Sequence, residues 1–379
     1  MKNTNTKYYK LKRISIIILI CFIVIIISTV YILSKKKYKE VDEHSKIMIN
    51  INEMTLDEKI GQMVLSGFNG TDFNSELDTL INDLKVGGVI LFSRNIEDSK
   101  QLKKLNLDIE EANKNIPVFI SIDEEGGRVN RLDKNIKRFE SAKSIGDKGD
   151  IKYAYENGKE IGKTLKEHKI NMNFAPVLDI YSNSKNTVIG DRAFGNNEKI
   201  VETMGIATMN GLKDEDVIPV IKHFPGHGDT EVDSHIGLPI VDKSIDQLYD
   251  FEFVPFKKAI ESGADAVMVS HILMKQIDDK NPATLSYNLI TGILRNDMKF
   301  SNVIITDDMC MKAITNRLSV EEASIKSIKA GSDIILIGSD IGKTKSVIEK
   351  IKLEVETNEI SEKRIDESVY RILKLKEKL

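Results

Sequence analysis

Short apolar runs that alternate with helical segments are the feature that most limits how this chain can fold. Eight runs of four to six residues have the composition of buried parallel strands, and lysine-rich segments of helical period separate them. The runs are Gln62–Ser66, Gly87–Phe92, Pro117–Ile122, Met172–Val177, Ile218–Ile221, Ala264–Val269, Asn302–Thr306 and Asp333–Ile337. Eight strand–helix units predict an α/β fold, a (β/α)8 TIM-type barrel. A doubly wound open sheet is the alternative.

A charge-free run near the N-terminus predicts a membrane-spanning helix. Residues 14–33 are twenty residues without a charged side chain, about the length that a helix needs to cross a bilayer. A cleavable signal peptide would have a shorter apolar run and an A-x-A-like site, whereas Ser34 and three lysines follow here. Lipid attachment at Cys21 is the alternative, but Ile20 precedes it where a small residue is expected. We therefore expect an uncleaved anchor.

This anchor sets the predicted domain organisation. We expect a cytoplasmic segment over 1–13, a transmembrane anchor over 14–33, a juxtamembrane stalk over 34–53 and the barrel domain over 54–379. Five cations precede the apolar run and four follow it closely, and we expect the N-terminus on the inside. The expected location is the cell membrane, with a single pass and the barrel domain outside.

Charge and cysteine content exclude several classes of partner and site. The net charge is −3, and because nine cations stand among the first 40 residues, the remainder of the chain is strongly acidic. Clustered Lys and Arg side chains bind phosphate backbones, so nucleic acid is excluded as a partner. Two cysteines allow neither a disulfide framework nor a cysteine-rich metal site. We expect no cofactor, because the sequence holds neither a nucleotide-binding fingerprint nor a credible set of metal ligands. We also expect a monomer.

Polar residues directly follow, or end, four of the apolar runs. They are Asp123, the pair Lys222 and His223, the pair Ser270 and His271, and Asp307. An aspartate after a strand usually caps a helix or faces solvent. In a barrel, however, the carboxyl ends of the strands meet at the end where active sites lie. Four such positions therefore predict a site at that end.

Histidines concentrate in one segment, KHFPGHGDTEVDSH, over residues 222–235. Its glycines and proline exclude a regular helix, so the segment predicts a shaped loop. If the end of the loop is extended, Asp233 and His235 point to the same side, and the carboxylate can hydrogen-bond the imidazole and fix its tautomer. This arrangement suits a histidine that transfers protons.

Two other interpretations of this loop stay open. Buried histidines can stabilise a loop by bonding to its backbone, without any chemistry. A metal site would draw on His223, His227, Asp229 and His235, but helical HxxxH geometry is absent and the Lys222 cation would repel a metal ion.

The same segment resembles the signature of the bacterial β-N-acetylglucosaminidases of glycoside hydrolase family 3, K-H-F-P-G-H-G-D-T-x-x-D-S-H. Further segments are similar to motifs of that family in the same order: GGVILFSRN (87–95), IDEEGGRVNRL (122–132), NFAPVLDI (173–180), GDRAFG (190–195) and VIITDDM (303–309). The resemblance spans about residues 54–340. It implies a barrel-type β-N-acetylhexosaminidase of the single-domain kind.

By this resemblance, Asp307 is the nucleophile of a retaining glycosidase, and Asp308 braces the following helix. Retaining enzymes form a covalent glycosyl intermediate on a carboxylate, while a second group protonates the leaving oxygen and then activates water. The resemblance implies His235, paired with Asp233, for the second role. A histidine of ordinary pKa, about 6.5, exchanges protons near neutrality without the upward shift that a carboxylic acid needs.

The resemblance also implies a set of residues that bind the terminal N-acetylglucosamine: Asp123, Arg192, Lys222, His223 and, with less support, His271. Polar side chains that project from several strand ends can hold the hydroxyl groups of one sugar ring. The alternatives are an ion pair between Arg192 and Asp191 and an ion pair of Lys222 in the barrel interior.

The implied function is removal of terminal N-acetylglucosamine from fragments of peptidoglycan. One alternative is a phosphorylase on the same scaffold, because a neutral histidine does not repel an anionic acceptor as a carboxylate would. The other is a catalytically inactive protein that binds wall sugars. The presence of Asp307, Asp233 and His235 together counts against that last interpretation.

Overall fold

The computed structural model describes most of the chain from residue 45 onward and a few positions before it. The described residues are 22, 26, 28, 29, 35, 45–113, 115–133, 135–338 and 340–379. The chain divides into two compact units, Met1–Glu53 and Met54–Leu379. In the first unit, residues 45–53 are helical. The second unit contains the sheet and the candidate site.

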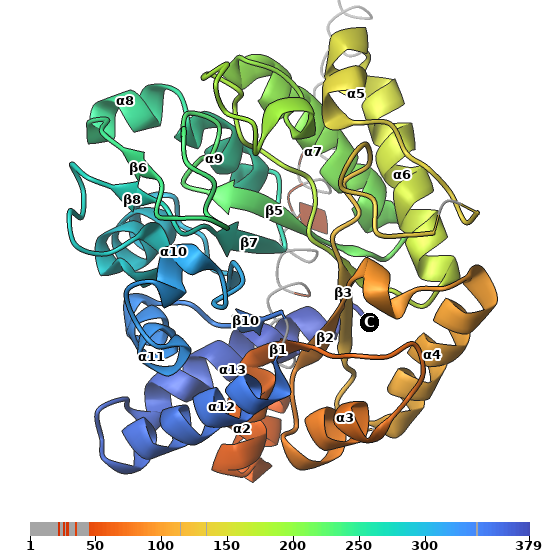
Figure 1. Ribbon diagram of the computed structural model, residues 1–379, viewed down its shortest axis with the longest axis vertical. Helices are drawn as coiled ribbons and strands as arrows, with labels where there is room; N and C mark the ends of the chain where they lie inside the picture. The colour runs from red at the N-terminus through yellow and green to blue at the C-terminus, as the bar shows by residue number, and fades with distance from the viewer. Residues whose placement is uncertain are drawn as a thin grey trace, which may run out of the picture. The chain divides into compact units, whose positions relative to one another are not determined.

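Eight parallel strands form the centre of the second unit (Figure 1), in the order β10-β1-β2-β3-β4-β5-β7-β9. Their bounds are β1 Val64–Gly67, β2 Gly88–Leu91, β3 Phe119–Ile122, β4 Met172–Asn173, β5 Ile218–Phe224, β7 Ala266–Val269, β9 Val303–Thr306 and β10 Ile335–Ile337. A parallel bridge between Ile305 and Ile334 nearly closes the sheet between β9 and β10. The structure fits the predicted TIM-type barrel, because an open sheet would leave these two edge strands apart.

Helices surround the strands, and each strand is followed by at least one of them (Figure 1). The α-helices are α2 Leu56–Gln62, α3 Ser75–Asp78, α4 Ser99–Ala112, α5 Ala142–Lys148, α6 Ile151–Glu167, α7 Glu198–Asp214, α8 Ile245–Asp250, α9 Phe253–Glu261, α10 Lys312–Thr315, α11 Val320–Ala330, α12 Ile341–Glu356 and α13 Glu362–Lys376. Shorter or wider helical segments are η1 Thr79–Asp83, η2 Ser93–Asn95, η3 Gly190–Arg192, η4 Ala283–Leu285 and η5 Asn288–Asp297.

Side-chain caps fix where several helices begin. Thr55 accepts the Glu58 N–H, and the Glu58 carboxylate accepts the Thr55 N–H in return. This capping box satisfies two backbone donors that have no partner within the helix. Ser319 begins α11 by the same exchange with Glu322.

β4 is shorter than predicted, because its pairing is interrupted by a proline. The predicted run Met172–Val177 contains Pro176, which has no N–H to donate to a neighbouring strand. Pairing resumes after it, where Val177 bridges Lys222 and the Leu178 N–H donates to the Lys222 carbonyl at 2.6 Å. A small second sheet, β6 Ile240–Val241 with β8 Leu273–Met274, was not predicted, since two-residue strands leave no periodic pattern.

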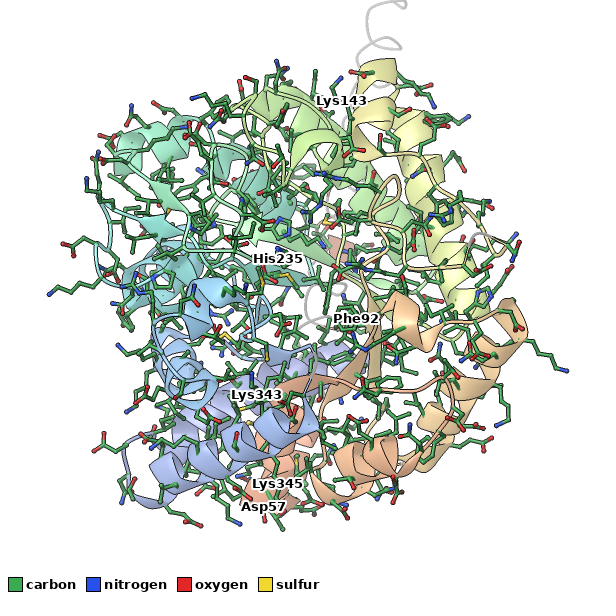
Figure 2. The ribbon with its side chains drawn as sticks, viewed as in Figure 1. Asp57, Phe92, Lys143, His235, Lys343 and Lys345 are labelled. Atoms are coloured by element: carbon green, nitrogen blue, oxygen red, sulfur yellow. The ribbon has the colours of Figure 1, made fainter. Side chains whose placement is uncertain are left out.

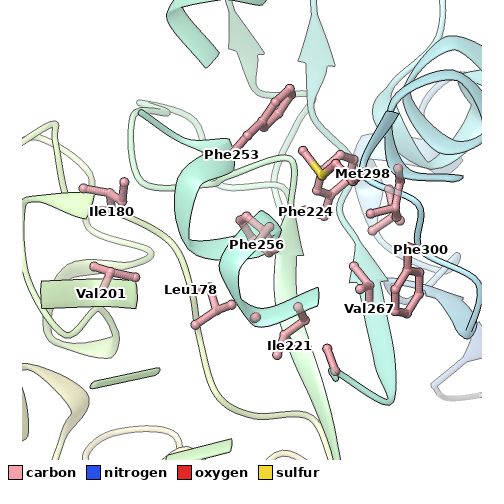
Figure 3. Close-up of a cluster of buried hydrophobic side chains, with 14 of the residues drawn as sticks. Leu178, Ile180, Val201, Ile221, Phe224, Phe253, Phe256, Val267, Met298 and Phe300 are labelled. Carbon is pink, nitrogen blue, oxygen red and sulfur yellow. The ribbon is translucent and has the colours of Figure 1, made fainter. Parts of the chain in front are cut away.

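Apolar side chains fill the space between β5, β7 and the helices α7 and α9 (Figure 3). The Phe224 ring centroid lies 5.5 Å from that of Phe253, in a stacked arrangement, and 5.5 Å from that of Phe256, edge to face. Burying a phenylalanine side chain contributes about 1.5–3 kcal/mol. Phe224 directly follows Lys222 and His223, the polar residues at the end of β5. Its packing therefore fixes the position of that end of the strand.

The structure corrects the prediction of a transmembrane helix over 14–33 and, with it, the single-pass location in the cell membrane. Among the described residues, no helix combines the length and the apolar character that crossing a bilayer requires. Of the run itself, the structure describes only Phe22, Ile26, Ser28 and Thr29, and its other positions lie outside the described residues. The prediction rested on hydropathy, which is only one requirement for a membrane anchor. The other requirement is a helix that is long enough to cross the bilayer.

One buried carboxylate at the start of β10 holds the closing strands and α13 together. Asp333 accepts the Ile304 N–H at 2.9 Å and the Ser368 hydroxyl at 2.8 Å, and it forms ion pairs with Arg295 and Arg371. Burial raises the pKa of Asp333, but the neighbouring arginines outweigh this and the net effect is a lowered pKa.

We expect Asp333→Asn to lower the free energy of unfolding by about 3–5 kcal/mol, because it leaves the buried Arg295 cation without its counter-charge. Urea unfolding measures this loss. Asp57→Asn is the matched control, since Asp57 pairs with Lys352 on the surface, and we expect it to change the stability little. Similar losses in the two variants would contradict the role of Asp333.

A lysine at the end of α13 is buried against the amino ends of the first strands. The Lys376 Nζ lies 2.7 Å from Gln62 Oε1, 2.8 Å from the Gly87 carbonyl and 4.8 Å from the Phe119 ring centroid. No carboxylate faces it among these contacts, and burial lowers the pKa of Lys376 to about 7. A neutral amine still supplies the two hydrogen bonds.

We expect the stability of the parent protein, relative to Lys376→Met, to rise between pH 7 and pH 9. In this window the unfolded lysine, with a pKa near 10.4, binds more protons than the folded one, so the free energy of unfolding increases with pH by up to about 1.4 kcal/mol per pH unit. Urea unfolding of both proteins at the two pH values measures the difference. A difference that does not change with pH would contradict a neutral buried Lys376.

Candidate active site

A cavity of about 220 Å³ lies at the carboxyl ends of the barrel strands. Its lining includes Phe92 after β2 and polar residues that follow or end β3, β5 and β9. Phe92 and His235, both in the lining, are labelled in Figure 2. The polar lining residues are Asp123, Glu125, Arg131, Arg192, Lys222, His223, His227, Ser234, His235, Asp307 and Asp308.

Asp307 stands directly after β9 and lines the cavity. Its backbone N–H donates to the Val269 carbonyl at 2.9 Å, and its Oδ1 accepts the Asp308 N–H at 2.8 Å. Burial raises the pKa of Asp307, but the neighbouring His271, His223 and Lys222 and the hydrogen bond from the Asp308 N–H together lower it below the ordinary value. The carboxylate is therefore ionised, and its Oδ2 is the oxygen not used by the Asp308 N–H.

Asp308 braces the turn that follows. Its Oδ1 accepts the N–H of Cys310 and the N–H of Gly338, each at 2.9 Å. The two bonds tie the end of β9 to the residue after β10. Asp307 and Asp308 are thus adjacent in sequence but have different surroundings.

Two cations of the lining share one buried carboxylate. Lys222 Nζ lies 2.6 Å from Asp123 Oδ1 and 2.6 Å from Glu125 Oε1. Arg192 contacts Glu125 through Nε and Nη2, both at 2.8 Å, a bidentate pair. Burial raises the pKa of Glu125, but Arg192 and Lys222 outweigh this, and the net effect is a strongly lowered pKa. Glu125 is therefore an ionised carboxylate between two cationic side chains.

These contacts decide between the alternatives that the sequence left open. Arg192 does not pair with Asp191, which instead forms an ion pair with Arg128 at 2.9 Å. Lys222 does form ion pairs inside the barrel, and it also lines the cavity. Glu125 was missed by the sequence analysis, although it stands in the same DEEGGR segment as Asp123.

Arg131 is a second lining residue that was missed. Its Nη2 lies 3.8 Å from Asp123 Oδ2, and its buried Nε has no hydrogen-bond partner among the residues that the structure describes. Arg131 stands in the segment over 122–132 that carries the family resemblance, so the segment contained a signal for it.

His223 is oriented by a carboxylate behind it. Its Nδ1 lies 2.6 Å from Asp179 Oδ2, and its Nε2 lies 3.2 Å from Arg192 Nη2. A guanidinium only donates, so Nε2 accepts and Nδ1 carries the hydrogen that is donated to Asp179. This tautomer assignment follows from the partners of the ring. Asp179, in the segment NFAPVLDI, was not predicted as part of the site.

The predicted contact between Asp233 and His235 is present, but the backbone differs from the prediction. His235 Nδ1 lies 2.8 Å from Asp233 Oδ1, which also accepts the His235 N–H at 2.8 Å. The Ile236 and Gly237 N–H groups donate to the Asp233 carbonyl, so the segment is a turn and not an extended strand. The His235 side chain is 67% exposed and is part of the cavity lining.

His271 lies beneath the site and does not line the cavity. It is fully buried, with Nδ1 2.6 Å from Thr284 Oγ1 and Nε2 3.0 Å from the Asp308 carbonyl. Of the predicted site residues, the structure brings six around the cavity: Asp123, Arg192, Lys222, His223, His235 and Asp307. It places Asp233 against His235 and His271 against the backbone of Asp308.

Comparison with known proteins agrees with the resemblance seen in the sequence. The model of the glycosyl hydrolase family 3 N-terminal domain matches residues 55–375. Beta-hexosaminidase A of Pseudoalteromonas piscicida is 34% identical over 336 residues, covering 82% of this chain and 56% of that protein. Beta-hexosaminidase of Nitrosomonas eutropha is 32% identical over 301 residues, covering 77% of this chain and 86% of that protein.

A solved structure also superposes on this fold. It is a glycoside hydrolase family 3 β-N-acetylglucosaminidase from Paenibacillus sp. str. FPU-7, with a TM-score of 0.84 and 40% identity, and the match covers 86% of this chain and 62% of that one. The chain thus spans less than two thirds of the length of two of these relatives. Because the family model covers nearly the whole barrel unit, the chain belongs to glycosyl hydrolase family 3.

Proposed function

We propose that this chain is a retaining exo-β-N-acetylglucosaminidase that removes terminal N-acetylglucosamine through a covalent intermediate on Asp307. The observation that carries the proposal is the pairing of two groups on one cavity. Asp307 is an ionised carboxylate at the end of β9, and His235 is an exposed imidazole held by Asp233. The relatives named beta-hexosaminidase support the same reaction class.

The reaction has two steps, and in each step Asp307 and His235 make or break the bond to the sugar and transfer the proton. In the first, Asp307 Oδ2 attacks the anomeric carbon, the bond to the leaving oxygen breaks, and His235 Nε2 gives its proton to that oxygen. In the second, His235 Nε2 takes a proton from water, the water oxygen attacks the anomeric carbon, and Asp307 is released as a carboxylate. Asp233 accepts the Nδ1–H throughout and stabilises the imidazolium.

The polar lining is proposed to hold the sugar. Asp123 accepts hydrogen bonds from hydroxyl groups, while Lys222, Arg192 and His223 are held by Glu125 and Asp179 in fixed orientations. At about 220 Å³, the cavity is smaller than the roughly 300–1,000 Å³ typical of sites for drug-sized ligands. A cavity of this size suits one terminal sugar ring and therefore exo-cleavage. We propose fragments of peptidoglycan with a terminal β-linked N-acetylglucosamine as the substrate.

We expect Asp307→Asn to lower kcat for a chromogenic β-N-acetylglucosaminide by about a thousandfold or more, because the variant cannot form the covalent intermediate. Release of the chromophore by the full chain measures this. Asp340→Asn is the matched control, since Asp340 caps α12 and asparagine caps a helix equally well. Undiminished turnover in Asp307→Asn would rule out the proposed nucleophile. Sugar phosphate formed in phosphate buffer would instead identify a phosphorylase.

We expect His235→Ala to act differently on good and poor leaving groups. The value of kcat/KM reports the first step, in which only a poor leaving group needs a proton. The variant should therefore lose about 100-fold or more in kcat/KM for a β-linked disaccharide and little for a 2,4-dinitrophenyl glycoside. Equal losses on both substrates would contradict the acid role of His235.

A further inference from the structure

The loop that carries His235 has little apolar packing of its own. Of residues 231–236, Ser234 alone is buried, at 2% exposure, while Val232 and Ile236 are 44% and 69% exposed. The positions on both sides of Ser234 are Asp233 and His235. A segment without apolar burial is held by its polar contacts, so the contacts of Ser234 decide where the Asp233–His235 pair lies.

Ser234 is held from two sides. Its carbonyl accepts the Ala313 N–H at 3.1 Å, from the helix that follows Asp307 and Asp308. Its hydroxyl lies 3.2 Å from His227 Nε2. The other ring nitrogen of His227, Nδ1, lies 2.7 Å from Thr230 Oγ1. We call the two contacts of this ring, with Thr230 and Ser234, the His227 bridge.

The His227 bridge starts from a rigid base. The His227 N–H donates to Asp179 Oδ1 at 2.7 Å, and its carbonyl accepts from Asn186 Nδ2 at 2.7 Å. Asp179 is the same carboxylate that orients His223 through Oδ2. One buried carboxylate thus fixes the sugar-binding histidine and the backbone of the bridging histidine.

The His227 ring is neutral near pH 7. Burial and the neighbouring His223 lower the pKa of His227 to about 4. A neutral imidazole has one donor and one acceptor nitrogen, and the hydroxyls of Thr230 and Ser234 can take either role. Both contacts are therefore satisfied in either tautomer, and neither ring nitrogen is left for a substrate.

We propose that His227 is a positioning residue for proton transfer, acting through the Ser234 hydroxyl to hold the Asp233–His235 pair over the cavity. The inference rests on the proposed role of His235 as acid and base. If the bridge acts in this way, losing it displaces His235 Nε2 from the leaving oxygen but leaves Asp307 and the sugar contacts in place. The loss then affects only substrates that need a proton in the first step.

Ser234→Ala in the full chain tests the bridge with the smallest change. We expect kcat/KM for a β-linked disaccharide to fall about tenfold, as for the loss of one aligned hydrogen bond, and kcat/KM for the 2,4-dinitrophenyl glycoside to change less than about twofold. His227→Phe should change the ratio of kcat/KM between the two substrates at least as much as Ser234→Ala does. The double variant should change it no more than His227→Phe alone, because both substitutions remove the same contact.

His168→Phe is the matched control for removing a buried histidine. His168 also uses both ring nitrogens, with Ser99 Oγ at 2.8 Å and the Thr164 carbonyl at 2.7 Å, but it does not line the cavity. We expect this variant to lose stability and to keep the parent ratio of kcat/KM between the two substrates. If His168→Phe changed the ratio of kcat/KM between the two substrates, general destabilisation alone would be enough to change this ratio. That result would overturn the inference.

The outcomes separate the inference from the proposed function. Equal losses on both substrates in Ser234→Ala, or no loss on either, would overturn the role of the bridge. If His235→Ala still discriminates between the leaving groups in that case, the acid role of His235 stands and only the bridge fails. If His235→Ala does not discriminate, the proposed function fails first, and the inference fails with it.

Discussion

Closure of eight parallel strands is the constraint on which the rest of the structure depends. Each strand satisfies its backbone groups on both sides only if the sheet closes. The last strand, β10, pairs with the first, β1, and the bridge from Ile305 to Ile334 joins β9 to the start of β10. Closure brings all the carboxyl ends of the strands to one end of the barrel. Residues as distant in sequence as Asp123 and Asp307 therefore line one cavity of about 220 Å³.

At that end, opposite charges are placed so that the buried carboxylates Glu125 and Asp307 remain ionised. Glu125 is held between Lys222 and Arg192, and Asp307 is stabilised by nearby positive charge and by the Asp308 N–H. The cost of removing these charges from water is offset by close pairing. The same pairing fixes the donors that are proposed to meet the sugar, so stability and recognition rest on one set of contacts.

The fold was largely predictable because buried parallel strands leave continuous apolar runs, and the residues after them mark the strand ends. The contact of Asp233 with His235 was predictable from their spacing, although the turn between them was not. The sequence did not indicate Glu125 or Asp179 as partners, because the choice among several carboxylates depends on distances that only the closed barrel sets. The membrane helix over 14–33 was wrongly predicted from hydropathy alone, since among the residues that the structure describes no helix is long and apolar enough to cross a bilayer.

The most direct test of the account is to trap the intermediate. A fluorinated N-acetylglucosaminyl substrate slows the second step more than the first, so a covalent sugar adduct accumulates on a retaining enzyme. Peptide mapping by mass spectrometry then locates the adduct. The account predicts one sugar per chain, attached to Asp307, and no adduct in Asp307→Asn. An adduct on another carboxylate, or turnover of the parent without any adduct, would contradict Asp307 as the nucleophile.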